Sequence, residues 1–280
     1  MTIEELTRLV PPPALPVDAE GDWRGVETEL GLALPDDFKG LVQTYGRGQF
    51  VDHVTPLQAF GPTASLLARA RSFTERERKT LQDYPELSPT GFYPAASGLL
   101  EWAVDDDGVS YCWVTAGPPE SWRVTIWDAR NRRVERFDHD ATGFLAGWLQ
   151  GTLESRLLIA SPDVPPWFQP FRRRSHAYVV LSDSDIPYEE RLRVLKDALA
   201  PIQERGSALG DEDEDDRQDF FAAVNRDWII TYETAYAHQI RFAYPPEDDN
   251  AVRVFATAVA PTMGSRIVRT TDRRGAPIWS

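Results

Sequence analysis

The side chains with the clearest chemical potential in this sequence are carboxylates that occur in runs. Asp105-Asp106-Asp107 stand directly before Gly108, and six acidic residues follow one another at 211–216. Clustered carboxylates can bind calcium, but an EF-hand loop needs alternating ligands and a closing glutamate, which the first run lacks. An Asp-Gly pair between two strands is instead typical of a hairpin turn, and a run of like charge is typical of a solvated loop. Contact with a basic partner remains open to both runs.

Other residues that could act on a substrate or a metal are isolated. Asp138, His139 and Asp140 are adjacent in the chain, and no further ligand lies at a metal-binding spacing from them. The single cysteine, Cys112, lies in a predicted strand, where a thiol usually packs as a small apolar group. Neither a glycine-rich phosphate loop nor a serine-nucleophile motif is present. The sequence therefore predicts no catalytic residue, no metal site and no cofactor. One enzymatic alternative is a site in the second half, built from His176, Asp183, Asp185 and His238.

The predicted hairpin needs strands on both sides of its turn. Residues 100–104 and 109–113 alternate apolar side chains with polar or small ones, as strands with one buried face do. Further strands are predicted at 122–127 and 133–137. Apolar residues at helical spacing, with Gly31, Gly46 and Asp140 as candidate caps, predict helices near 23–30, 35–45, 63–82 and 141–150. Antiparallel hairpins flanked by helices predict an α+β fold.

A proline-rich segment divides the chain. Residues 159–175 contain four prolines, which exclude a helix or a central strand, together with aromatic residues that we expect to pack against a domain. The predicted organisation is therefore an N-terminal extension (1–21), a first domain (22–158), a linker (159–175) and a second, smaller domain (176–280). In the second domain the order βαβββαβ, with its first helix extending to Ile202, predicts an α/β sandwich similar to ferredoxin-like folds.

Composition narrows the classes of partner. The 280 residues include 44 acidic and 30 basic side chains, a formal charge of -14. This charge argues against a general nucleic-acid binder, which needs basic residues to neutralise phosphates, and against docking on an anionic membrane. One cysteine excludes an internal disulfide. The N-terminus lacks the pattern of a signal peptide, and the apolar runs are too short to span a bilayer. We therefore expect a cytoplasmic protein.

Short blocks of the first half have an order and spacing that carry a family likeness. They are Trp23–Glu27, Leu30–Lys39, Tyr45–Gly48, Phe92–Pro94, Gly98–Ala103, Asp105–Gly108, Tyr111–Trp113, Trp122–Val124 and Phe144–Gly151. Together they resemble the SUKH superfamily (Smi/Knr type) over about residues 22–158. Ala103 departs from the pattern, since the family more often has glycine there. The second half lies outside the resemblance.

The resemblance implies a non-enzymatic binding module with a SUKH-like antiparallel sheet flanked by helices. Bacterial members are mostly regarded as cytosolic immunity proteins that block polymorphic toxins, many of them nucleases. Because nucleases bind phosphates and are commonly basic, an acidic inhibitor would be steered towards such a toxin. The leading hypothesis is therefore immunity to a basic toxin. The alternative is a regulatory or scaffold protein of the Smi/Knr cell-wall type without a toxin partner. The oligomeric state stays open.

The expected partner contacts lie on the hairpin and in the second acidic run. On the hairpin they are the carboxylates of Glu101, Asp105, Asp106 and Asp107, with Trp102 and Trp113 as aromatic anchors. In the second run they are Asp211, Glu212 and Asp213.

Overall fold

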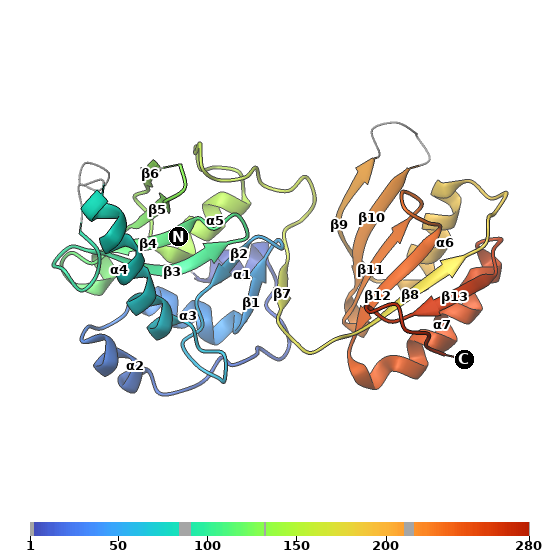
Figure 1. The fold of residues 1–280 in the computed structure, drawn as a ribbon, viewed down its shortest axis with the longest axis horizontal. Helices are drawn as coiled ribbons and strands as arrows, with labels where there is room; N and C mark the ends of the chain where they lie inside the picture. The colour runs from blue at the N-terminus through green and yellow to red at the C-terminus, as the bar shows by residue number, and fades with distance from the viewer. Residues whose placement is uncertain (1–2, 84–90, 132, 210–215, 280) are drawn as a thin grey trace. The chain divides into compact units, whose positions relative to one another are not determined.

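A computed structural model describes residues 3–83, 91–131, 133–209 and 216–279. The chain forms two compact units (Figure 1). The first comprises residues 1–162 and 166–171, and the second comprises residues 163–165 and 172–280. Each unit has its own sheet and its own helices.

The first unit is built on a seven-stranded sheet of order β6-β5-β4-β3-β2-β1-β7. Its strands are β1 (Gly48–Phe50), β2 (Val54–Pro56), β3 (Leu99–Asp105), β4 (Ser110–Val114), β5 (Val124–Asp128), β6 (Arg133–Arg136) and β7 (Phe168–Pro170). Its helices are α1 (Ile3–Leu9), α2 (Trp23–Leu30), α3 (Asp36–Tyr45), α4 (Leu66–Asp83) and α5 (Ala141–Leu149). Neighbouring strands are antiparallel throughout, which confirms the predicted α+β class.

Three helix ends of the first unit are set by residues that the sequence marks. Gly31 and Gly46 follow α2 and α3 with φ angles of 69° and 67°, a left-handed conformation that glycine adopts most easily. The carboxylate of Asp140 accepts a hydrogen bond from the Gly143 N–H at 2.7 Å and caps the first turn of α5. These ends confirm the predicted boundaries.

Helices cover both faces of this sheet. On one face, the rings of Trp102 and Trp113 stack with centroids 5.9 Å apart, and Phe38 of α3 meets Trp113 edge-on at 5.0 Å. On the other face, Phe73 of α4 belongs to a buried cluster with Cys112 and residues of β3 and β5. Strand β3 is therefore buried on both sides, although its sequence alternates.

Four elements of the first unit are not predicted from the sequence: α1, β1, β2 and β7. Helix α1 lies in residues that we expected to form an extension, yet Leu6 is fully buried, and Tyr45 donates its O–H to the Val10 carbonyl at 2.6 Å. Strand β7 lies in the proline-rich segment. It is an edge strand beside β1, where a proline such as Pro170 is tolerated. Phe168 packs against Tyr45 there, with ring centroids 5.1 Å apart.

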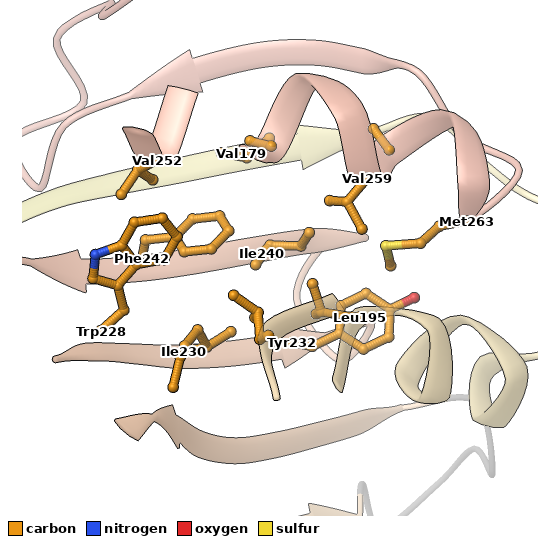
Figure 2. Packing of buried hydrophobic residues seen from close by; sticks show 14 of the residues in the cluster. Val179, Leu195, Trp228, Ile230, Tyr232, Ile240, Phe242, Val252, Val259 and Met263 are labelled. Carbon is orange, nitrogen blue, oxygen red and sulfur yellow. The ribbon is translucent and has the colours of Figure 1, made fainter. Parts of the chain in front are cut away.

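The second unit has a six-stranded antiparallel sheet of order β13-β8-β12-β11-β10-β9. Its elements are β8 (Ser175–Leu181), α6 (Tyr188–Leu199), β9 (Ile202–Leu209), β10 (Arg217–Ala223), β11 (Trp228–Glu233), β12 (Gln239–Tyr244), α7 (Asp249–Thr262) and β13 (Ile267–Thr271). Both helices contribute to one core on the same face of the sheet: Leu195 of α6 and Val252, Val259 and Met263 of α7 meet aromatic residues of β11 and β12 (Figure 2).

The order of this unit is βαββββαβ, one strand more than predicted. Because successive neighbours are antiparallel, β8 runs parallel to β9 and β12 runs parallel to β13, so each helix joins the two strands of a split βαβ unit. The sheet therefore resembles the predicted ferredoxin-like fold with two additional strands, β10 and β11, inserted inside it. Helix α6 ends at Leu199, before the predicted Ile202, because Pro201 cannot donate the next helical hydrogen bond. Ile202 begins β9.

Candidate functional site

Two neighbouring hairpin turns bring three exposed carboxylates to one end of the first sheet. Strand β2 pairs with β3 so that Val54 lies opposite Asp105, which places the β1–β2 turn beside the β3–β4 turn. Asp52 in the first turn is exposed, and so are Asp106 and Asp107 in the second. We call Asp52, Asp106 and Asp107 the acidic hairpin tips. No described basic side chain lies within ion-pair distance of their carboxylates.

A side-chain amide links the two turns. Gln49 Nε2 donates to the carbonyl oxygen of His53 at 3.2 Å and to the carboxylate of Asp106 at 2.9 Å. Gly108 closes the second turn with a φ angle of 81°, a conformation that suits glycine. The acidic hairpin tips therefore stand on turns that are fixed to each other.

Asp105 points inward and supports the second turn. Its carboxylate accepts hydrogen bonds from the Val109 N–H at 2.8 Å and from the Tyr111 O–H at 3.1 Å. His53 Nε2 lies 3.5 Å from the same carboxylate. Burial, together with this carboxylate, raises the pKa of the Tyr111 phenol well above its usual range, so Tyr111 remains a donor. The first aspartate of the run is therefore structural, while the next two face solvent.

The first turn stores backbone strain. Val51 and Asp52 have φ angles of 46° and 52°, and a positive φ is unusual for a β-branched residue such as valine. The Val51 N–H donates to the Trp167 carbonyl at 3.0 Å, and this bond holds the turn against the chain that leads into β7. Such strain persists where the surroundings hold it and is common at functional sites.

The site lies within a recognised family domain. Residues 20–145 match the SUKH_6 family model, described as SMI1-KNR4 cell-wall. The chain contains a SUKH-superfamily domain. The matched range includes both hairpin turns and confirms the resemblance found in the sequence, and the second unit lies outside it. No curated protein and no solved structure matches this chain.

Three residues that we expected to contact a partner lie in the interior of the SUKH domain. Glu101, Trp102 and Trp113 have no exposed surface. The Glu101 carboxylate accepts hydrogen bonds from Arg69 Nε at 2.7 Å and Nη2 at 2.6 Å, and from Ser110 Oγ at 2.6 Å. The two tryptophans fill the core. In this conformation these residues, like Asp105, hold the sheet together and have no surface for a partner.

The first unit also has a small polar pocket beside Asp107. Its volume is about 220 Å³, and it is lined by Asp107, Val109, Asp128, Arg130, Asn131, Arg133, Arg156 and Leu157. Burial raises the pKa of Asp128, but hydrogen bonds from Asn131 and Arg133 outweigh burial and lower it. Arg130 and Arg156 are exposed. A partner at the acidic hairpin tips would therefore meet carboxylates with arginines next to them.

Asp52 is not predicted from the sequence as a residue of this site. Its hairpin has strands of three residues each, and its turn contains none of the glycine or asparagine residues that mark short hairpins. The apolar residues Phe50 and Val54, which pair across the turn, were the only local signal.

The remaining expected residues do not join this site. Asp211, Glu212 and Asp213 lie outside the described residues, and Asp216 is half-buried. His176 and His238 lie at opposite ends of β8, where His176 pairs with Ala243 and the His238 carbonyl accepts from the Leu181 N–H. In the part of the chain that the structure describes, no three potential metal ligands gather, and no helix is long and apolar enough to span a membrane.

Proposed function

We propose that this chain is a non-enzymatic protein-binding module, an immunity protein that neutralises a basic toxin in the cytoplasm through the acidic hairpin tips. The observation that carries the proposal is the SUKH domain with three exposed carboxylates on two turns that are fixed to each other. Binding loses less conformational entropy when the contact residues are already held in place. Neither nucleic acid nor a membrane is part of this proposal.

The charge of the acidic hairpin tips supports a basic partner. Exposed carboxylates without an ion-pair partner attract basic side chains over a longer range than hydrogen bonds do, and this attraction raises the association rate. Arg130 and Arg156, which line the neighbouring pocket, would restrict the choice to partners that present a carboxylate next to their basic residues. This arrangement of carboxylates beside arginines favours one partner over other basic proteins.

The test is co-expression with a candidate toxin gene taken from beside this gene. The wild-type chain should restore growth and form a stable complex with the toxin. The variant with Asp52, Asp106 and Asp107 each changed to Asn should bind about tenfold more weakly, because exposed ion pairs contribute about 0.2–1 kcal/mol each. The control variant changes three exposed glutamates, Glu20, Glu75 and Glu120, to Gln. These substitutions remove the same charge elsewhere in the SUKH domain.

The outcomes separate the pairing from the site. Absence of both rescue and complex formation overturns the immunity proposal. A complex that the Asp-to-Asn variant leaves unchanged overturns the acidic hairpin tips as the contact and leaves the pairing standing. Equal weakening by both variants would mean that total charge acts, with no specific contact at the tips.

The cell-wall description of the matching family supports a second candidate, a regulatory or scaffold protein without a toxin partner. Gene neighbourhood distinguishes the two. A toxin gene beside this one favours immunity, and cell-wall genes in its place favour the regulator.

A further inference from the structure

We propose that the second unit binds an amphipathic helix of a partner protein, apolar on one side and acidic on its flanks, in a groove between α7 and β13. This inference is independent of the proposed immunity function, because it concerns a unit outside the family match.

Two helices are too few to cover this sheet. After β13 the chain turns at Asp272–Gly275, and the next residues pair with the outer edge of β13: the Ile278 N–H donates to the Thr270 carbonyl at 3.1 Å. Strands lie about 4.8 Å apart, so six strands and this added segment span roughly 29 Å. Helices are about 10 Å wide, so α6 and α7 cover roughly 20 Å. About one helix width remains.

The uncovered strip lies over β13. Helix α7 packs on β8 and β12, and β13 is the next strand after β8 at that edge of the sheet. A groove of about 670 Å³ lies at this place, with α7 as its wall and β13 and residues 277–279 on its other side. Ile267, Ile278 and Trp279 line it and also pack against the core, so the groove continues the core at its edge.

The exposed side of α7 suits another helix. Val254 and Ala258, one turn apart, line the groove beside the buried face of α7. Val254 is 57% exposed, and Val268 of β13 is 61% exposed. A small molecule is usually enclosed far more completely than so open a groove allows. A helix laid beside α7 would cover both valines, since amphipathic helices bind apolar grooves through residues at positions i, i+3, i+4 and i+7.

The charge of the groove specifies an acidic partner. Residues 249–279 carry five arginines and two carboxylates, in a chain whose formal charge is -14. The carboxylates are Asp272 and Asp249, and Asp249 accepts a hydrogen bond from Trp279 Nε1 at 3.2 Å. Arg253 and Arg269 line the groove itself, and among the described residues neither has a carboxylate within ion-pair distance. Acidic residues on the flanks of a bound helix would pair with these two guanidinium groups, whereas basic flanks would be repelled.

The test uses the full chain and a fluorescein-labelled synthetic peptide of about 18 residues. The peptide has leucine at the i, i+3, i+4 and i+7 positions of a helix and glutamate or alanine elsewhere. A second peptide carries lysine in place of glutamate. We expect saturable binding of the acidic peptide by fluorescence anisotropy, binding at least about tenfold weaker for the basic peptide, and slower hydrogen exchange in residues 253–258 and 267–270.

Variants locate the binding. Arg253→Glu with Arg269→Glu should weaken binding of the acidic peptide about tenfold or more, and Val254→Glu should abolish it. The control, Arg24→Glu with Arg193→Glu, makes the same charge change at exposed positions outside the groove and should leave affinity unchanged. Absence of saturable binding, equal affinity for both peptides, or equal weakening by the groove and control variants overturns the proposal. Thermal unfolding of each variant verifies that it is folded.

Discussion

The aspartate run of the β3–β4 turn should separate into a structural residue and recognition residues. Asp105, Asp106 and Asp107 are chemically identical in the sequence, yet Asp105 accepts hydrogen bonds from Val109 and Tyr111 inside the domain. Asp106 accepts one bond from Gln49 at the surface. Changing each aspartate to asparagine removes one charge from a side chain and keeps its shape. Any difference in stability between the variants therefore comes from the surroundings of the residue.

The expected loss of stability is large for Asp105. A hydrogen bond to a charged group contributes about 1.5–3 kcal/mol, and a buried donor left unpaired costs about 1–3 kcal/mol. Asparagine offers one carbonyl oxygen in place of two carboxylate oxygens, and its NH₂ group would face one of the present donors. We therefore expect Asp105→Asn to lower the free energy of unfolding by about 2–4 kcal/mol. Asp106→Asn keeps an oxygen that can accept from Gln49, so it should change the free energy of unfolding by less than about 0.5 kcal/mol.

Differential scanning calorimetry can measure this difference in the full chain. A loss of 2–4 kcal/mol should lower the Tm of the first unit by roughly 4–16 °C. Leu195→Ala, which opens a cavity in the core of the second unit, identifies the transition of that unit and serves as the reference. Equal and small shifts for Asp105→Asn and Asp106→Asn would refute the inward role of Asp105.

Three further predictions concern stability. Glu101→Gln should cost about 2–3 kcal/mol in urea unfolding, because it leaves Arg69 facing a neutral group that is fully buried. Gly46→Ala should cost about 3 kcal/mol or more and Gly31→Ala only about 1 kcal/mol. Both have a positive φ, but a Cβ at Gly46 would lie 2.3 Å from a backbone oxygen while Gly31 faces open space. Burial and a nearby arginine lower the pKa of His238 in the folded chain. As the pH falls, His238 is therefore protonated in the unfolded chain before it is protonated in the folded chain. Stability should be full above about pH 6.5 and fall as the pH drops below it, and His238→Gln should flatten that profile in Tm measurements.

The fold could be predicted where local signals are strong. Gly31, Gly46 and Asp140 mark helix ends through backbone conformation and capping, and Gly108 marks a hairpin through its turn. These effects depend on a few neighbouring residues. The short strands β1, β2 and β7 could not be predicted, because three residues leave no period to read. The pairings of β1 with β7 and of β2 with β3 also join segments that are distant in sequence.

The candidate site was predicted only in part, because burial depends on what covers a strand. Alternation along β3 put Trp102 on the apolar face of the strand, yet we expected Trp102 as a surface anchor, and it is buried. The same alternation implied an exposed Glu101, which is buried as well. Arg69 on α4 donates a hydrogen bond to Glu101 from the opposite face of the sheet. The sequence of β3 alone does not predict that a helix covers this face. The same reasoning explains Trp113, expected as a surface anchor and found stacked on Trp102. Conspicuous residues of a strand can serve the core as readily as a partner.

The position of charge, more than its total, should decide what this chain binds. At physiological ionic strength electrostatic interactions decay over about 8 Å. A partner at the acidic hairpin tips therefore responds to Asp52, Asp106 and Asp107 and to the arginines beside them, and the formal charge of -14 acts only weakly. Raising the salt concentration should slow association of a basic toxin with the wild-type chain and have much less effect on the variant with three Asn substitutions. An equal salt dependence in both chains, measured by stopped-flow association, would show that the total charge attracts the partner and that the acidic hairpin tips have no special role.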